Sequence, residues 1–428
     1  MSSGPGGPYS LVDPLVGRRS AVVELHELVG GFIEDISPFV SKVTVNSSLD
    51  TPFMGVTVTM SDNDEILSRL KVDGDVAVVF KAYAGNDDFI TGKFHINSIS
   101  FIPQNNRKTN AVQLNCIAME HIHNASQKVQ EWQYWYKPQK ISTIIRDIAS
   151  KYLSITPKGN GSTTGSQNIN IPKLHPMEAI TMLCQRAWGM KKNIFAFYQK
   201  FLDGKPEYFF DEISTLMSNS NKWTLYLTEN NVGQVEHEID TDYLAGSTVS
   251  KITSFNSNSF YDAHNMIKQG YPGRTYIKMD FINKVYKSDD NDEQQVVIGE
   301  KQMPKVVSVA QSTADPYYNR TLYDPFNGDD TYFKDPLLEL NFKLSRPVVS
   351  GLLNKRISVM TYGCPSIGPG DTVEIVSPGS TADGEQRAGT VNEDLSKKYL
   401  VYSVAHAFGV APSKTFVTEL QLASDGQR

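Results

Sequence analysis

Cysteine is scarce in this 428-residue chain, and the scarcity excludes several kinds of site. The three cysteines, Cys116, Cys184 and Cys364, lie far apart, and no C-x-x-C occurs. A zinc knuckle or a dithiol redox centre needs cysteines at such short spacing, so neither is predicted. Cys116 alternates with Leu114 and Val112, which favours a small apolar core residue. A sparse, odd count is typical of a chain that assembles in a reducing cytoplasm.

Long apolar runs are also missing. No stretch of 18 apolar residues occurs, so no transmembrane helix is predicted. The first residues, Met1 to Pro8, lack the basic and apolar regions of a signal peptide. We therefore expect residues 1–20 to form a flexible tail. The length of the chain predicts more than one domain, and 40% hydrophobic with 21% charged residues is ordinary for a globular protein.

An excess of positive charge is absent as well. Lysine and arginine together number 41 against 47 aspartate and glutamate residues, which gives a formal net charge of −6. A general nucleic-acid binder needs a basic face that displaces counterions from phosphate. The charge balance therefore argues against that class of function.

Recognised catalytic motifs are missing. No G-x-S-x-G or H-E-x-x-H occurs, and Gly368-Pro369-Gly370 is followed by an aspartate and a β-rich run instead of the lysine and helix of a phosphate loop. Glutamates stand beside histidines at Glu120-His121 and near His26, but 47 carboxylates and eight histidines produce such neighbours by chance. We predict no catalytic residue and no cofactor.

The sequence also lacks a set of metal ligands at a recognised spacing. His121 and His123 could share one side of a strand, but no third ligand lies nearby, so packed or exposed histidines are favoured. The acidic runs 62–65 and 289–292 lack the ligand spacing of a calcium loop. We interpret the first as a helix start and 288–293 as a polar loop, and predict no metal site.

Aromatic residues gather in one stretch. Trp132, Tyr134, Trp135, Tyr136 and Trp188 could stack sugars or bases. The surrounding segment is not strongly basic, which argues against nucleic acid. A place in the core or in a subunit interface is the stronger interpretation.

A three-part signature is present twice, near each end of the chain. A Gly-Asp turn opens a strand, an aromatic-led strand follows, and a strand that closes on alanine comes last. The first copy consists of 72–80, 94–100 and 112–118, and the second of 367–376, 399–405 and 418–423. Around the first copy, 41–46 and 56–60 alternate like strands, with a short helix between about 64 and 70. This density of short strands predicts a barrel or a curled antiparallel sheet.

Helical spacing and an aromatic hairpin separate the two copies. Apolar residues recur every three or four positions from Ile141 to Tyr152, and Pro176 stands where a helix begins. Two aromatic strands, 194–198 and 207–210, flank an Asp203-Gly204 turn. A further strand at 249–255 is expected to open the second barrel, which the chain leaves and rejoins between 345 and 362.

The predicted fold is mainly β with α+β insertions, as two similar tandem β-barrel domains. The expected divisions follow from these changes of pattern. They are a tail at 1–20, a first barrel at 21–122, an α+β insertion at 123–232, the start of the second barrel at 233–265, a second insertion at 266–340, the rest of the second barrel at 341–424, and a tail at 425–428.

The order of these motifs resembles the baseplate hub proteins of contractile-tailed bacteriophages, which are related to the N-terminal part of type VI secretion spike proteins. The resemblance depends on the end of the first barrel at 117–121, the helix at 141–148, the segment 175–183 before the hairpin, and the last block 368–373, 399–406 and 416–422. The last block is the most specific part, and the resemblance covers about 21–424.

The resemblance implies a homotrimeric torus without catalytic residues. Each subunit would give two barrels, so that three subunits present six to the sixfold tail tube and a threefold face to the central spike. Surrounding baseplate wedge proteins would be further partners, and phage DNA would pass through the lumen without specific binding. It implies a location in the virion tail after assembly in the host cytoplasm. Because the second barrel is expected to end near 424, we expect the spike to be a separate polypeptide.

Two other classes of function remain open from the sequence. A cell-wall hydrolase would degrade peptidoglycan through an acidic residue. A glycan-binding or adhesion tail protein would use Trp132 and Trp135. An infectious phage, a defective particle and an extracellular injection system are not separable from the residues.

Overall fold

The computed structural model of the chain describes part of its length, in segments that cover both predicted barrels and the region between them. These are residues 21–28, 31–62, 67, 72, 75–84, 88–102, 111–131, 134, 137–189, 195–227, 249–259, 274–280, 285–291, 297–298, 301–302, 322–324, 355–362, 364–380, 386–392, 395–410 and 416–424.

The first part of the chain forms a curled antiparallel sheet around one core. Its neighbour order is β2-β1-β5-β6-β7-β4-β3. Val56, Val58 and Met60 of β4 are buried at every second position, as the alternating sequence predicts, and side chains from β1, β3 and β5 to β7 join the same core. The strands are β1 (Ala21–Glu27), β2 (Ile33–Asp35), β3 (Val40–Ser48), β4 (Gly55–Ser61), β5 (Val76–Ala84), β6 (Asp88–Ile102) and β7 (Ala111–Ala118). The helix predicted between 64 and 70 and the Asp73-Gly74 turn fall mostly outside the described residues.

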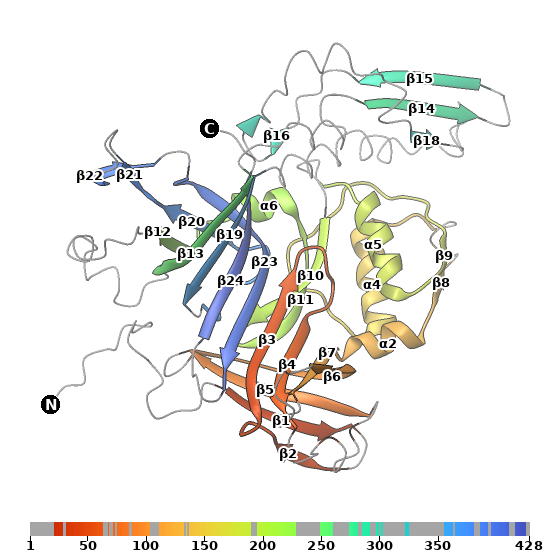
Figure 1. Cartoon of the computed structure of the whole chain (residues 1–428). Helices are drawn as coiled ribbons and strands as arrows, with labels where there is room; N and C mark the ends of the chain where they lie inside the picture. Colours follow the sequence, from red (N-terminus) through yellow and green to blue (C-terminus); the bar gives the residue numbers. More distant parts are fainter. Residues whose placement is uncertain are drawn as a thin grey trace.

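A helical region with its own core follows the first sheet. Together with the aromatic hairpin, it is called the inserted region. The two predicted helices are confirmed as α4 (Ile141–Leu153) and α5 (Pro176–Arg186), which pack together (Figure 1). Pro176 occupies the first turn of α5, and Glu178 accepts a hydrogen bond from the His175 backbone N–H at 2.9 Å. The other elements of this region are α2 (Glu120–Ser126), β8 (Val129–Glu131), β9 (Ile171–Leu174) and α6 (Ile213–Ser218).

The predicted aromatic hairpin is β10 (Phe195–Leu202) and β11 (Lys205–Glu212), joined by Asp203-Gly204. Both turn residues have positive φ, 50° and 76°, as a two-residue hairpin turn requires. A side chain is disfavoured at Gly204 because its Cβ would lie 2.5 Å from the Phe89 carbonyl oxygen in β6. The hairpin therefore contacts the first sheet as well as the helices.

The last part of the chain contains a closed barrel of six strands. Neighbours run β12-β20-β23-β24-β19-β13, and β13 pairs with β12 to close the ring. The strands are β12 (Trp223–Leu227), β13 (Val249–Ser259), β19 (Lys355–Tyr362), β20 (Thr372–Val376), β23 (Lys398–Gly409) and β24 (Phe416–Ser424). The opening strand is thus β12, not 249–255 as expected from sequence. The sequence did not indicate β12 because the strand has only five residues, too few to show a periodic pattern. Its neighbours β13 and β20 both run parallel to it.

The remaining described strands form short ribbons, and in the sequence they fall between strands of the barrel. The acidic stretch 288–293, expected as a polar loop, is instead mostly strand, because β15 runs to Asn291 and its backbone pairs with β14. Ladder hydrogen bonds outweigh the low strand preference of aspartate here. The ribbon strands are β14 (Arg274–Asp280), β15 (Val285–Asn291), β16 (Val297–Ile298), β17 (Lys301–Gln302), β18 (Leu322–Asp324), β21 (Pro378–Ser380) and β22 (Gln386–Val391).

One pairing joins the two β-rich parts. The second half of β23, from Ser403 to Gly409, pairs antiparallel with Lys42 to Ser48 of β3, and the two strands lie side by side in Figure 1. The result is a single sheet of 13 strands. Phe408 of β23 belongs to the core of the first part, against Phe80 at 6.0 Å between ring centroids.

The two parts place their strands in the same neighbour order. Taken in chain order, β1, β3, β4, β5, β6 and β7 correspond to β12, β13, β19, β20, β23 and β24, and the orders β1-β5-β6-β7-β4-β3 and β12-β20-β23-β24-β19-β13 then coincide. They differ at the first strand. β12 runs parallel to both of its neighbours, whereas β1 is antiparallel to β5 and has no ladder with β3 among the described residues.

Candidate functional site: the charge cluster between the inserted region and the barrel

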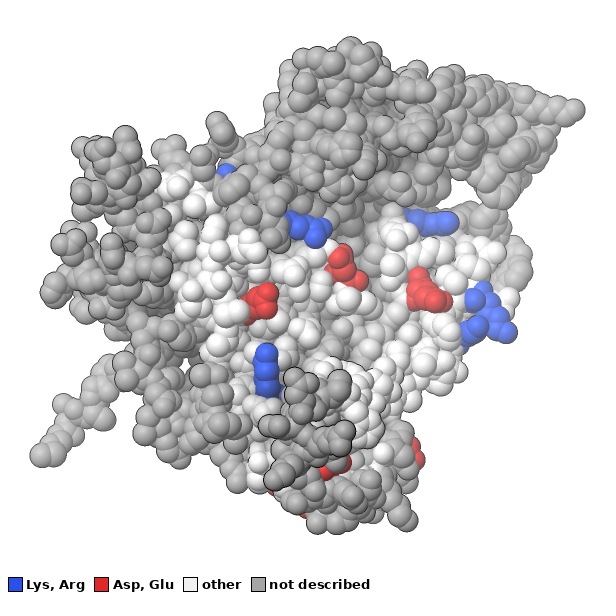
Figure 2. Space-filling model, viewed as in Figure 1, with Lys and Arg blue, Asp and Glu red and all other residues white. Residues whose placement is uncertain are grey.

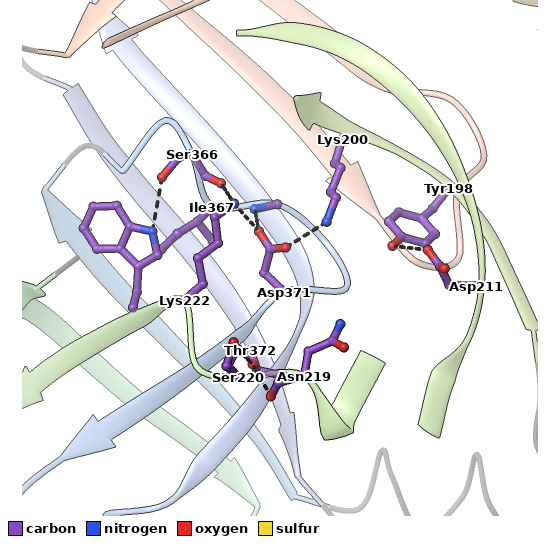
Figure 3. Close-up of polar contacts among 12 residues, drawn as sticks. Tyr198, Lys200, Asp211, Asn219, Ser220, Lys222, Ser366, Ile367, Asp371 and Thr372 are labelled. Carbon is purple, nitrogen blue, oxygen red and sulfur yellow. Dashed lines mark hydrogen bonds and ion pairs between the residues drawn. The ribbon is translucent and has the colours of Figure 1, made fainter. Parts of the chain in front are cut away.

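A cluster of charged side chains surrounds Asp371, where the second Gly-Asp turn opens β20 (Figure 3). One Asp371 oxygen lies 2.7 Å from Lys200 Nζ, and the other lies 3.0 Å from Lys222 Nζ. The second oxygen also accepts a hydrogen bond from the Gly368 backbone N–H at 2.9 Å. Both carboxylate oxygens are therefore engaged by partners within the chain.

The three charged residues come from three different elements. Lys200 is on β10 of the hairpin, Lys222 stands just before β12, and Asp371 stands just before β20. The side chain of Asp371 is 10% exposed and that of Lys200 is 14% exposed. An ion pair this sheltered from solvent is screened weakly by salt, so it holds the hairpin against the barrel turn.

Uncharged contacts reinforce the same junction. The Lys222 backbone N–H donates to the Thr372 carbonyl at 2.8 Å, and the Thr372 hydroxyl donates to the Ser220 carbonyl at 2.8 Å. Lys222 Nζ also donates to the Ser366 carbonyl, and Trp223 Nε1 donates to the Ser366 hydroxyl at 3.2 Å. The segment that leads into β12 is thus fixed to both ends of the turn.

A buried tyrosine continues the junction into the inserted region. The Tyr198 hydroxyl donates to Asp211 at 3.2 Å, and Asp211 also accepts from the Asn160 backbone N–H at 2.8 Å. Burial raises the pKa of Tyr198 well above its ordinary value, and the nearby carboxylates of Asp211 and Asp371 raise it further. Tyr198 is therefore a neutral hydrogen-bond donor near pH 7.

His406 of β23 is buried beside the turn, where its ring contacts Phe201 of β10 and Phe416 of β24. Its Nε2 lies 3.2 Å from the Ile367 carbonyl oxygen and its Nδ1 lies 3.2 Å from the Thr418 hydroxyl. Burial lowers the pKa of His406 to about 4, although the Ile367 hydrogen bond acts in the opposite direction. The imidazole is therefore neutral near pH 7 and connects the turn to β24.

The structure separates most of the residues that the sequence offered for chemistry. His26 and Glu24 contact each other at 2.8 Å on β1, whereas Glu120 accepts a hydrogen bond from the Tyr208 hydroxyl at 2.9 Å. His121 lies edge-on to the Phe53 ring, and burial together with His95 lowers its pKa. Within the described part of the chain, no group of three or more histidine, cysteine or acidic residues is placed to hold a metal ion.

The cysteines and aromatic residues are placed largely as apolar packing. Cys116 is buried in the first core, as predicted, and Cys184 and Cys364 are buried free thiols. Burial raises the pKa of Cys116 and of Cys184 to about 12. Tyr134 and Trp188 are buried, while Trp132, Trp135 and Tyr136 lie outside the described residues.

The surface carries its charges in a scattered pattern. On the face in Figure 2, the described lysine, arginine, aspartate and glutamate side chains lie in small groups, and no continuous area of one sign is visible. In the part of the chain that the structure describes, two large apolar side chains are strongly exposed, Phe101 at the end of β6 and Ile33 on β2. Among the described helices, none is long and apolar enough to cross a membrane.

The Asp371 cluster could not be found by sequence inspection. The Gly-Pro-Gly-Asp motif predicted the turn correctly, but Lys200 and Lys222 lie 171 and 149 positions away from Asp371. No spacing rule connects residues at such separations. Only the pairing of the hairpin and β12 with the barrel brings them together.

Comparisons with known proteins identify the fold. No family model and no curated protein matches this sequence. Among solved structures, the chain is similar to a tail protein from Neisseria meningitidis MC58, with a TM-score of 0.52 and 10% identity, over 95% of this chain and 97% of that one. It is also similar to the 43 kDa tail protein of prophage MuSo2 from Shewanella oneidensis, with a TM-score of 0.51 and 11% identity, over 95% and 98%.

The chain therefore shares the fold of these two tail proteins along nearly its full length. A weaker similarity, with a TM-score of 0.43 and 7% identity, covers 94% of this chain and 76% of an Escherichia coli component of the type VI secretion system, which is itself structurally similar to tail proteins of bacteriophage T4. A score below 0.5 does not establish a common fold, so this third similarity adds nothing to the fold assignment.

Proposed function

We propose that the chain is a structural baseplate hub protein of a contractile phage tail. Three copies form a ring with pseudo-sixfold symmetry that joins the sixfold tail tube to the threefold central spike. The fold shared with two tail proteins, one of them from a prophage, over nearly their full lengths supports a place in the tail. The protein serves assembly and not catalysis, in the virion tail. Its partners are a tube or tube-initiator protein, the central spike protein and surrounding wedge proteins.

The observation that carries this proposal is the neighbour order shared by the two β-rich parts of the chain. Two tandem barrels of similar topology give a ring of three subunits six similar units, which matches a sixfold neighbour. In the first unit, β2 pairs with the edge of β1 away from β5, and the described residues form no β1–β3 ladder. This difference and the reversed β12 are departures from an ideal repeat. The Asp371 cluster keeps the inserted region at a fixed orientation to the barrel, which a ring with two different faces requires.

The charge of the assembly fits a channel for DNA. A ring of three copies carries a formal charge of −18, three times −6. A net negative ring repels phosphate in general, so DNA can pass through the lumen without being held by specific contacts. The small, scattered charged groups on the face in Figure 2 agree with the absence of a nucleic-acid binding surface there.

Light scattering on the purified full-length chain tests the proposal first. The expected result is the mass of a trimer, and electron microscopy of tail ends decorated with the protein should place a ring between tube and spike. A hub would have to be abandoned if the protein were found at another position in the tail. Degradation of peptidoglycan by the purified chain, lost on mutating one acidic residue, would favour an enzyme instead.

A further inference from the structure

The junction between the two parts of the chain is a pattern that can repeat between copies. Inside one chain, the second half of β23 pairs with β3. In the order shared by the two parts, β23 corresponds to β6, and β3 corresponds to β13. The matching junction would pair the second half of β6 with β13, and within one chain these two strands are not neighbours.

Register shifts in four ladders fix how the strands correspond, residue by residue. The pairing of β6 with β7 shifts between Ile96 and Ser98, and that of β23 with β24 shifts between Val401 and Ser403. A bulge inserts one extra residue at a defined place, so Asn97 corresponds to Tyr402 and Phe101 to His406. The β3 and β13 ladders likewise shift between Val40 and Lys42 and between Ile252 and Ser254, before the residues compared. The β13 ladder shifts once more, between Ser257 and Ser259, at the far end of the compared stretch. Val45 therefore corresponds to Ser257.

Among the described residues, both strands have an edge without a partner strand at the required place. Pairing of β6 with β5 stops at His95, so from Ile96 to Ile102 the described neighbour of β6 is β7 alone. Pairing of β13 with β12 stops at Ile252, so from Thr253 to Ser259 its described neighbour is β19 alone. Open edges of this length invite pairing with another chain.

The composition of the two edges does not prevent such pairing. Neither 97–102 nor 253–259 contains a lysine, arginine, aspartate or glutamate, although edge strands are commonly protected by charge. Phe101 is 75% exposed, whereas the corresponding His406, which has β3 beside it, is 1% exposed. The His406 ring also contacts the Phe201 and Phe416 rings, so β3 is one of several neighbours that surround it. A strand placed against the β6 edge would give Phe101 the backbone neighbour that β3 gives His406.

We propose that this edge of β6 binds a second copy of the chain, pairing antiparallel with the 253–259 edge of β13 in the neighbouring subunit. His406 pairs with Val45 and Ala407 with Thr44 inside the chain. The same register places Phe101 opposite Ser257 and Ile102 opposite Asn256 of the next copy. Such a contact is heterologous, because different edges meet, and it closes into a ring when the rotation between copies permits. The inference rests on the proposed hub ring and specifies the surfaces that hold it together.

Disulfide formation across the predicted register provides the test. In the full-length chain, the double variant Ile102→Cys with Asn256→Cys is oxidised and run on a denaturing gel; the native cysteines are buried and stay unpaired. Cross-linked species of two and three chains are expected. The control, Ile102→Cys with Ser254→Cys, displaces one partner by two positions and is expected to cross-link at least about tenfold less, because a disulfide tolerates only a narrow Cα separation.

A second variant tests the surface without cysteines. Phe101→Glu places a charge on the open edge and is expected to weaken self-association at least about tenfold. Its matched control is Ile33→Glu, because Ile33 is 65% exposed but lies on β2, away from both edges. Light scattering over a concentration series measures both effects, and circular dichroism shows that each variant is folded.

The outcomes separate this interface from the hub function. A wild-type trimer in which neither the cross-link nor the Phe101→Glu effect is seen overturns the interface and leaves the hub proposal intact. A wild-type chain that stays monomeric at every concentration also overturns it. In-register cross-links in a protein that is then located away from the tube–spike junction support the interface and refute the hub proposal.

Discussion

At the scale of single residues, the buried charge of Asp371 holds the inserted region to the barrel. Asp371 accepts from two lysines and a backbone N–H, so three of the roughly four acceptor sites of its carboxylate are filled by the chain itself. A buried ion pair of this kind adds little stability compared with apolar packing, but the removal of one partner leaves the other charge without compensation. The residue therefore matters for the orientation of two elements more than for their separate stabilities.

Asp371→Asn keeps the shape of the side chain and removes its charge. The expected loss in the free energy of unfolding is about 3 kcal/mol, because Lys200 then lies charged and sheltered beside a neutral amide. Urea denaturation measures it. The control is Lys158→Gln, which breaks the half-exposed pair with Glu207 at 3.0 Å and is expected to cost less than about 1 kcal/mol. Equal losses in the two variants would contradict a special role for the cluster.

His406 gives the chain a dependence on acid. Its pKa is lowered to about 4 in the folded protein, below the ordinary value near 6.5, so between these two pH values only the unfolded state binds the proton. Stability is therefore lost as the pH falls from about 6.5 toward about 4, and is unaffected by this group above that range.

The variant His406→Gln should remove that part of the acid sensitivity. Relative to the variant, the wild type is expected to lose about 2 kcal/mol more between pH 7 and pH 5, as follows from the difference between the two pKa values. Urea midpoints at the two pH values measure the difference. Parallel losses in both proteins would show that His406 already binds its proton in the folded state.

At the scale of elements, the turn before β20 depends on one backbone conformation. Gly370 has a φ of +81°, and a Cβ there would lie 2.6 Å from the Tyr198 hydroxyl oxygen. The left-handed conformation is accessible to glycine, and the close approach lets the hairpin reach the barrel. The turn and the β10–β11 hairpin are thus packed as one unit.

Gly370→Ala is expected to destabilise the protein by about 1 to 3 kcal/mol, through backbone strain and displacement of Tyr198. The matched control is Gly55→Ala on β4, where an added Cβ meets nothing within 4 Å. The control is expected to change stability by less than about 1 kcal/mol. Thermal unfolding of both variants compares them, and an equally mild effect at Gly370 would argue against the strain.

At the scale of the whole molecule, the β3–β23 pairing makes the two β-rich parts fold as one. Phe408 comes from a barrel strand, yet it packs in the core of the first part, 4.8 Å between ring centroids from Phe416 and near Phe80. A core that takes side chains from both parts couples their stabilities.

Phe408→Ala is therefore expected to lower the stability of both parts by about 3 to 5 kcal/mol. Hydrogen exchange measures this locally, by the protection of amides in β4 of the first part and in β19 of the barrel. Both strands should lose protection together. A loss confined to β4 would mean that the two parts unfold independently, and would weaken the case for a rigid two-part subunit.

The sequence determined the local elements and the general kind of protein. The apolar periodicity of α4 and α5, the positive-φ turn at Asp203-Gly204 and the strands of both signatures depend on neighbours a few positions away, so they could be predicted. The order of the local motifs along the chain also resembles that of phage baseplate hub proteins. The structure in turn shares its fold with two tail proteins.

Tertiary structure alone decided the rest. The recruitment of β12 as the opening strand of the barrel, the closure by β12 and β13, and the sheet that β3 and β23 share depend on backbone pairing between segments far apart. The Asp371 cluster depends on the same long-range pairing. Hydrogen bonds and ion pairs between distant segments produce no periodic pattern in the sequence. The residues around each partner determine only its local helix, strand or turn, and they do not specify which distant segment it will contact.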